Sequence, residues 1–356
     1  MIFSAVSAAA TPSYGLIDLG TLGGTSSFAY GINSTDEVVG SADIGGGVQE
    51  AFLYTTSGGM VSLGLLTGGT TSVASGINNA GQITGTSDVT GGQDHAFYYN
   101  GTMHDLSVLS GGTFSQGQAI NNSGLAVGFS QMTGGLLQSV SSSNGGALTN
   151  LNITLTGGNQ SEAMGVNASG QVVGEATNSS GQFVAFSKSG ATTTNIGTLG
   201  GVSSEALGVN SSGEVVGFAD TATSSHAFSW TSGAPVDLGV LGTGKFSQAN
   251  GVNDSGEIVG TSATIASGKI SHAFLDIGGV MIDLNTLLDP AAQAEGWTVT
   301  SATGINNNGD IVGYATNGLT THAVLLEVVP EPTTVLEVIF GLGLLGLMAL
   351  RKRQQA

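Results

Sequence analysis

The stretch Gly251-Val252-Asn253-Asp254-Ser255-Gly256-Glu257-Ile258-Val259-Gly260 decides the fold, because the chain contains it seven times in related form. The pattern that the copies share can be written [D/N]-L-G-x-L-G-G, then G-[I/V]-N, then N-x-x-G-x-[I/V]-V-G, and then H-A-F, with departures in individual copies. Units this short cannot bury their own apolar faces, so they must stack on one another. The asparagine of G-[I/V]-N recurs at intervals of 45, 43, 46, 43, 43 and 53 residues, at Asn33, Asn78, Asn121, Asn167, Asn210, Asn253 and Asn306.

Each unit predicts four short β-strands and no helix. In the second unit the strands are expected at 60–64, 73–78, 82–86 and 95–99, each bounded by Gly, Asn, Ser or Asp. The N-x-x-G segment suits a tight hairpin in which Asn bonds its own backbone and Gly takes a positive φ. Four strands in about 45 residues, seven times over, predict an all-β, seven-bladed β-propeller. Four phenylalanines are expected to fill the spaces between blades: Phe97, Phe186, Phe228 and Phe274.

The phase of the repeat predicts how the ring closes. The first unit begins at the [D/N]-L-G strand, 16–20, and the last unit ends at the H-A-F strand, 322–328. Elsewhere these two strands form one hairpin, so we expect the first and last strands to pair and to remove two exposed edges. A β-solenoid is the alternative, and it would need capping units. An insertion at 289–297, with Asp289, Pro290 and Gly296 as start and stop signals, predicts a short helix on one face of the disc.

The composition excludes several classes of function. Of 356 residues, 60 are Gly and only 8% are charged, yet Asp and Glu outnumber Lys and Arg by 24 to 6. Three of the six basic residues are Arg351, Lys352 and Arg353, so the body is strongly acidic and nucleic-acid binding is not expected. The chain has no Cys, which excludes disulfides, thiolate metal sites and a Cys nucleophile.

The two ends have the composition of export signals. Residues 1–10 are apolar and then small, with A-x-A-like spacing, and are typical of part of a secretory signal peptide. The C-terminal segment 329–356 contains Pro330, Glu331 and Pro332, then an apolar stretch over 335–350, then the basic cluster 351–353. An apolar stretch of about 16 residues is short for a bilayer core of about 30 Å, and a basic cluster marks the cytoplasmic side.

Two family resemblances follow from these residues. Residues 14–328 resemble bacterial extracellular HAF repeats, named for the tripeptide seen at His95, His226 and His272, and that family supplies no catalytic residues. Residues 329–356 resemble a PEP-CTERM sorting signal. This resemblance implies a transmembrane helix and recognition by a membrane-embedded exosortase. It also implies cleavage near Pro330, Glu331 and Pro332, followed by release or attachment at the surface of a Gram-negative cell that makes exopolysaccharide.

Two recurring sets of side chains could bind metal. His95, His226, His272 and His322 occupy one position of the repeat, but equivalent positions in adjacent blades lie too far apart to share an ion, so a hydrogen-bonding role is expected. Glu37, Glu214, Glu257 and Asp310 recur after the turn and could bind Ca²⁺, although Gln82 and Gln171 at the same position favour solvated hairpin residues. No catalytic or metal residue and no cofactor is assigned.

The chain carries no G-x-S-x-G, H-E-x-x-H or phosphate-loop motif, so we do not expect an enzyme. Paired carboxylates for glycoside cleavage would come together only in the fold. The sequence therefore predicts a secreted, surface-sorted protein with a binding or structural role in an exopolysaccharide matrix. The alternatives are a carbohydrate-active enzyme on the propeller and a protein–protein adhesion scaffold.

Overall fold

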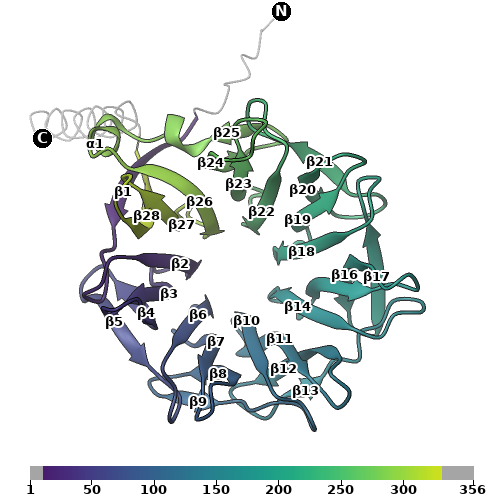
Figure 1. Ribbon diagram of the computed structural model, residues 1–356. Coiled ribbons are helices and arrows are strands. Elements are labelled where there is room, and N and C mark those ends of the chain that lie inside the picture. Colours follow the sequence, from purple (N-terminus) through teal and green to yellow (C-terminus); the bar gives the residue numbers. More distant parts are fainter. Residues whose placement is uncertain (1–10, 331–356) are drawn as a thin grey trace, which may run out of the picture.

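The computed structural model describes residues 11–330, which form seven four-stranded antiparallel sheets arranged around a central axis (Figure 1). The predicted seven-bladed β-propeller is confirmed. Blade 1 comprises β2 (Ser27–Ile32), β3 (Val38–Asp43), β4 (Gln49–Thr55) and β5 (Gly59–Gly64). Blade 2 comprises β6 (Ser72–Ile77), β7 (Ile83–Asp88), β8 (Asp94–Tyr99) and β9 (Met103–Asp105). Blade 3 comprises β10 (Ser115–Ile120), β11 (Leu125–Gln131), β12 (Leu137–Ser143) and β13 (Thr149–Asn150).

The remaining blades follow the same order, with the first strand of each nearest the axis (Figure 1). Blade 4 comprises β14 (Ser161–Val166), β15 (Val172–Thr177), β16 (Phe183–Ser189) and β17 (Thr192–Gly197). Blade 5 comprises β18 (Ser204–Val209), β19 (Val215–Asp220), β20 (Ser225–Trp230) and β21 (Val236–Gly239). Blade 6 comprises β22 (Ser247–Val252), β23 (Ile258–Ala263), β24 (Ser271–Asp276) and β25 (Met281–Asp283). Blade 7 comprises β26 (Thr298–Ile305), β27 (Ile311–Thr316), β28 (Thr321–Val329) and β1 (Ser13–Asp18).

Blade 7 is built from both ends of the propeller, as the phase of the repeat predicts. β1 pairs with β28 over six residue pairs, from Ser13 opposite Val329 to Asp18 opposite Val324. Tyr14 and Leu16 of β1 are buried in the same apolar cluster as Val324 and Leu326. The chain therefore closes its own ring by antiparallel pairing.

Large apolar side chains fill the spaces between blades. The four phenylalanines predicted for this role are fully buried, as is Phe52 of blade 1. Phe97 of blade 2, for example, packs in one cluster with Val39 and Leu63 of blade 1. Burying a phenylalanine side chain contributes about 1.5–3 kcal/mol, so each interface between blades is stabilised mainly by apolar contact.

The glycine of [I/V]-V-G is required by a close approach between the two inner strands of a blade. A β-bulge shifts the register of the innermost pair in every blade, and in blade 6 it lies between Ala249 and Gly251. A Cβ on Gly260 would overlap the carbonyl oxygen of Gln248 and press on the Phe274 ring. The N-x-x-G turns also form as predicted, and Gly256 has a φ of +77°.

The insertion in the seventh unit forms a 3₁₀ turn, η1 (Leu284–Thr286), and the predicted short helix, α1 (Pro290–Ala294). The Asp289 carboxylate caps the helix by accepting the N–H of Ala292 at 2.7 Å. The predicted position on a face of the disc is wrong, since α1 lies at the outer rim beside β1 (Figure 1). The reason is that Leu288 and Ala292 are buried against Tyr14 of the closing strand.

The predicted signal peptide, the transmembrane stretch and the basic cluster lie outside the described residues, as do Glu331 and Pro332. Within residues 11–330, no helix has the length and apolar character needed to cross a membrane.

Candidate functional site

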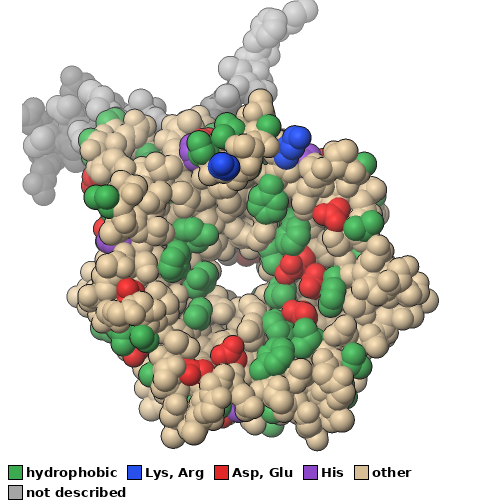
Figure 2. Space-filling model, in the orientation of Figure 1, with side chains coloured by type: hydrophobic (Ala, Val, Ile, Leu, Met, Phe, Trp, Pro, Cys, Tyr) green, Lys and Arg blue, Asp and Glu red, His purple; other side chains and the backbone are tan. Residues whose placement is uncertain are grey.

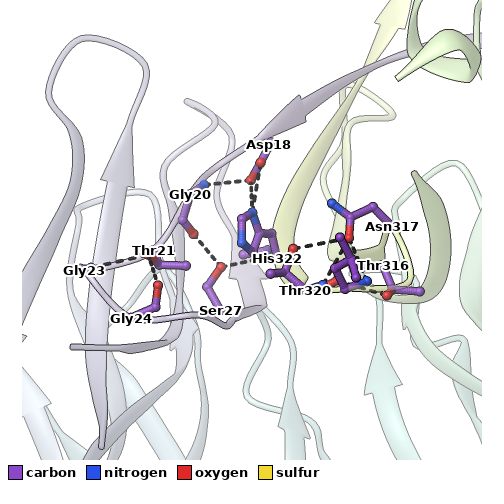
Figure 3. A network of polar contacts seen from close by, with 12 residues as sticks. Asp18, Gly20, Thr21, Gly23, Gly24, Ser27, Thr316, Asn317, Thr320 and His322 are labelled. Atoms are coloured by element: carbon purple, nitrogen blue, oxygen red, sulfur yellow. Dashed lines mark hydrogen bonds and ion pairs between the residues drawn. The ribbon is translucent and has the colours of Figure 1, made fainter. Parts of the chain in front are cut away.

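The H-A-F histidines lie in four different blades, and each contacts the aspartate of an Asp-Leu pair at the position of the [D/N]-L-G segment. The Nδ1-to-carboxylate distance is 2.6–3.0 Å in the pairs His95–Asp105, His226–Asp237, His272–Asp283 and His322–Asp18. Asp18 also accepts the N–H of Gly20 at 2.8 Å (Figure 3). Units that carry Glu50, Gln138 or Val184 in place of the histidine have Ser62, Asn150 or Asn195 in place of the aspartate. The histidines thus join the third and fourth strands of a blade.

A serine that the sequence analysis did not single out links neighbouring blades. Ser27 Oγ of blade 1 donates to the carbonyl of Gly20 at 2.5 Å and accepts the N–H of Ala323 of blade 7 at 2.8 Å (Figure 3). The same two bonds recur at Ser72, Ser115, Ser204 and Ser247. The sequence signal for this role was the fixed place of the serine in the repeat, two residues before a buried Ala or Gly.

A ring of seven asparagines surrounds one mouth of the central channel. The Nδ2 of each G-[I/V]-N asparagine donates to the backbone carbonyl of its counterpart in the next blade. The seven distances are 2.9–3.3 Å, and the last bond runs from Asn306 back to Asn33. We call this end the asparagine mouth. Its cavity of about 230 Å³ is lined by the same positions in all seven blades.

The acidic residues after the turn accept hydrogen bonds from these asparagines. Asn33 Nδ2 lies 2.6 Å from Glu37 Oε2, and Asn253 Nδ2 lies 2.6 Å from Glu257 Oε2. Glu214 and Asp310 accept from Asn210 and Asn306, while Gln82 and Gln171 do so from Asn78 and Asn167. Within residues 11–330, no three His, Asp or Glu side chains converge as a metal-binding group. The structure therefore gives these carboxylates a role in the asparagine ring.

The opposite end of the channel differs from blade to blade. We call it the variable mouth, a cavity of about 470 Å³ lined by Tyr30, Gln118, Met164, Leu207, Phe246, Gln248, Asn250, Thr261, Ser301, Thr303 and Tyr314. The lining is rich in amides, hydroxyls and aromatic rings. The ring of Tyr314 in blade 7 meets that of Phe28 in blade 1 edge to face, at 5.2 Å between centroids. Apart from Phe246, which precedes β22, the lining side chains come from the first and second strands of six blades.

Three glutamates lie beside this mouth in blades 4 and 5. Glu162 stands directly opposite Glu175 across the β14–β15 pair, and Glu205 occupies the equivalent of Glu162 on β18. Glu162 and Glu205 stand two residues before Met164 and Leu207, on the same sides of their strands. Figure 2 shows acidic and apolar side chains side by side along one edge of the central opening.

These glutamates hold protons more tightly than ordinary carboxyls. Burial raises the pKa of Glu175 to about 8, and the negative charges of Glu205 and Glu162 add to this rise. Burial and then the charge of Glu162 raise the pKa of Glu205 to about 7, and burial also raises the pKa of Glu162. The three carboxyls therefore share at least one proton near neutral pH. This group could not be predicted from the sequence, because its members come from three strands of two units.

Neither a known family model nor a curated protein sequence matches the chain. Solved structures with a similar fold include the BP39L lectin from Burkholderia pseudomallei, with 9% identity, 88% of this chain and 98% of that chain covered, and a TM-score of 0.45. Another is a Trypanosoma rangeli sialidase, with 11% identity, 89% and 60% covered, and a TM-score of 0.44. A mutant of AofleA from Arthrobotrys oligospora has 10% identity, 78% and 90% covered, and a TM-score of 0.41.

Proposed function

We propose that this propeller is a secreted, surface-sorted binding protein whose variable mouth binds saccharide chains of an extracellular polysaccharide. The observation that supports the proposal is the contrast between the two mouths. The asparagine mouth repeats one pattern seven times, so the fold accounts for its residues. Towards the variable mouth the channel is lined at one position of the repeat by Tyr30, Ser75, Gln118, Met164, Leu207, Asn250 and Thr303, so its chemistry changes from blade to blade.

The chemistry of the variable mouth suits a saccharide. Amide side chains such as Gln248 and Asn250 both donate and accept hydrogen bonds, as sugar hydroxyls require. Aromatic rings such as Tyr30 and Tyr314 offer apolar faces with a polar edge, against which the C–H face of a sugar ring packs. A cavity of about 470 Å³ falls in the range of small-ligand sites and has room for one or two sugar residues.

The proposed location rests on the two ends of the sequence. Residues 1–10 resemble part of a signal peptide, and Pro330, Glu331, Pro332, Arg351, Lys352 and Arg353 belong to the segment that resembles an exosortase sorting signal. An exosortase would then be the transient partner during sorting, and exopolysaccharide or surface proteins the partners outside the cell. The acidic body argues against nucleic acid as a partner.

Binding of the purified protein to neutral, acidic and deacetylated polysaccharides tests this function. We expect saturable binding that Gln248→Ala and Tyr314→Ala each weaken about tenfold, the loss expected for one or two hydrogen bonds or a ring contact. Asn79→Ala at the asparagine mouth is the matched control and should bind as the native protein does. Equal affinity in all variants would place the ligand elsewhere, and binding to no polysaccharide would favour an adhesion scaffold.

The glutamates favour a second candidate, cleavage of a glycosidic bond at the same mouth. A carboxyl with a pKa of about 8, such as Glu175, is protonated at neutral pH and can act as a general acid beside an ionised partner. The test is the appearance of new reducing ends during incubation with the polysaccharide that binds. Glu175→Gln should abolish cleavage and leave binding intact, whereas constant polymer length would exclude this candidate.

A further inference from the structure

Ser224, His226 and Asp237 form a hydrogen-bonded series in blade 5. Ser224 lies in the loop between β19 and β20, His226 on β20, and Asp237 on β21. Ser224 Oγ lies 3.0 Å from His226 Nε2, and His226 Nδ1 lies 3.0 Å from both carboxylate oxygens of Asp237. The N–H of Gly239 donates to Asp237 Oδ1 at 2.7 Å, so the carboxylate is itself held in place.

The hydrogen bonds fix where the imidazole proton lies. A carboxylate only accepts, so the proton of a neutral His226 ring is on Nδ1, facing Asp237. The lone pair of Nε2 then faces the Ser224 hydroxyl, which can donate to it; Ser224 Oγ also lies 2.9 Å from Thr221 Oγ1. A hydroxyl within reach of a base that a third group orients is the arrangement of an activated nucleophile. Ser224 is half-buried and follows two exposed residues, Ala222 and Thr223, so small molecules can reach it.

The other blades show that this serine is not needed for the histidine–aspartate pair. In the pairs of His95, His272 and His322, the residue two positions before the histidine is Gln93, Ile270 or Thr320. Among these, only Thr320 has a hydroxyl, and its Oγ1 bonds Asn317 Oδ1 at 3.4 Å. The structural pair is thus repeated four times in the described residues, and the serine is added to it once.

An apolar side chain borders the same loop. Ser225, next to Ser224, forms a parallel bridge with Phe246 at the start of blade 6. The Phe246 side chain is 38% exposed and also lines the variable mouth. It offers an apolar surface next to the loop that carries Ser224, on which the acyl part of a substrate can pack.

We propose that Ser224 is the nucleophile of an ester-hydrolysing site, with His226 as its base and Asp237 as a positioning residue, acting on carboxylic esters with small acyl groups. Ser224 Oγ bonds to the ester carbonyl carbon while its proton moves to His226 Nε2. The C–O bond of the ester then breaks, and the alcohol leaves with that proton. Water attacks the acyl-serine and gives one proton to Nε2, the carboxylic acid departs, and Ser224 regains the proton. The sum is ester plus water giving acid plus alcohol.

The turn that carries Ser224 limits the expected rate. The N–H groups of Thr223 and Ser224 donate to Thr221 Oγ1 at 3.3 and 3.0 Å, so in this conformation they do not face a reacting carbonyl oxygen. Ester hydrolysis at this site then depends on general-base catalysis by His226, and such catalysis raises a reaction rate by about 10²–10⁴-fold. We therefore expect reaction with activated esters and phosphonates.

Labelling of the full-length protein with a fluorophosphonate probe tests this proposal and does not depend on polysaccharide binding. Peptide mass spectrometry should find one adduct, on Ser224, and p-nitrophenyl acetate should be hydrolysed at a rate that Ser224→Ala reduces to background. Asp237→Asn should slow labelling about 10²-fold, because the imidazole loses the acceptor that sets its tautomer.

Two variants control for structural effects. Asp105→Asn breaks the same kind of pair in blade 2, where Gln93 stands in the place of the serine, and should lower the melting temperature as much as Asp237→Asn while leaving the labelling rate unchanged. Ser225→Ala removes the neighbouring hydroxyl and should label normally. The proposal is overturned if Ser224 carries no adduct, or if Ser224→Ala hydrolyses the ester as fast as the native protein.

Discussion

The side chain of each ring asparagine has a partner for every hydrogen-bonding group it carries. In Asn78, Oδ1 accepts the N–H groups of Ala80 and Gln82, both at 3.0 Å. Nδ2 donates to Gln82 Oε1 at 2.7 Å and to the Asn121 carbonyl of the next blade at 2.9 Å. One side chain therefore fixes the turn of its own blade and the spacing to the next.

Asn78→Ala should consequently cost about 2–4 kcal/mol of unfolding free energy, because it leaves several buried groups unpaired. Urea denaturation of the native protein and the variant gives the difference. Asn79→Ala is the matched control, since Asn79 is exposed and accepts one N–H, that of Ser34 at 3.1 Å. It should cost less than about 1 kcal/mol, and equal losses in the two variants would contradict the role given to the ring.

Glu175 should make the stability of the propeller depend on pH. Its pKa is about 8 in the folded chain and about 4.3 in an unfolded one, so the folded state binds the extra proton between these values. The stability that this proton contributes is fully present below about pH 4 and is lost as the pH rises through about 8. The melting temperature of the native protein should therefore fall between pH 6 and pH 9.

Glu175→Gln should reduce that fall by several degrees, since the amide stays neutral over the whole range. Differential scanning calorimetry at pH 6, 7.5 and 9 measures it. Glu295→Gln, on the exposed end of α1, serves as the control for a general change in net charge. A melting temperature that falls equally in the native protein and in Glu175→Gln would show that this carboxyl does not carry the effect.

The repeated sequence predicts some elements of this fold well and others poorly. Strands, turns and blade phase are dictated by local patterns that occur seven times, and the structure reproduces them, including the pairing of β1 with β28. The position of α1 was missed because it depends on a contact with Tyr14, which lies near the opposite end of the propeller sequence. The variable mouth was missed for a related reason. Glu162, Glu175 and Glu205 differ from most of their counterparts in other units and come together only in the fold, from two strands of blade 4 and one strand of blade 5.

The inner hairpin of each blade is the element most sensitive to added volume. Gly260→Ala should destabilise the protein by about 3 kcal/mol, because the new methyl group would overlap the Gln248 carbonyl, which is part of the backbone and cannot rotate away. Chemical denaturation measures the loss. Gly15→Ala on β1 is the matched control, since the nearest atom to its Cβ would be Val329 Cγ2 at 3.6 Å. A mild effect of Gly260→Ala would mean that the bulge shifts easily.

The propeller is a closed ring whose first and last strands lie side by side, so the pairing of β1 with β28 matters more than where the chain begins. A circular permutant tests this, with Val329 joined to Ser13 by a two-residue glycine-rich turn and new ends within the exposed loop 45–47. It keeps all seven blades and should unfold in one transition within about 2 kcal/mol of the native protein. A chain that starts at Thr21 loses the burial of Tyr14 and Leu16, at about 1.5–3 kcal/mol each, and leaves His322 without Asp18. It should melt well below the permutant, and equal melting temperatures would show that the seventh blade does not need its fourth strand.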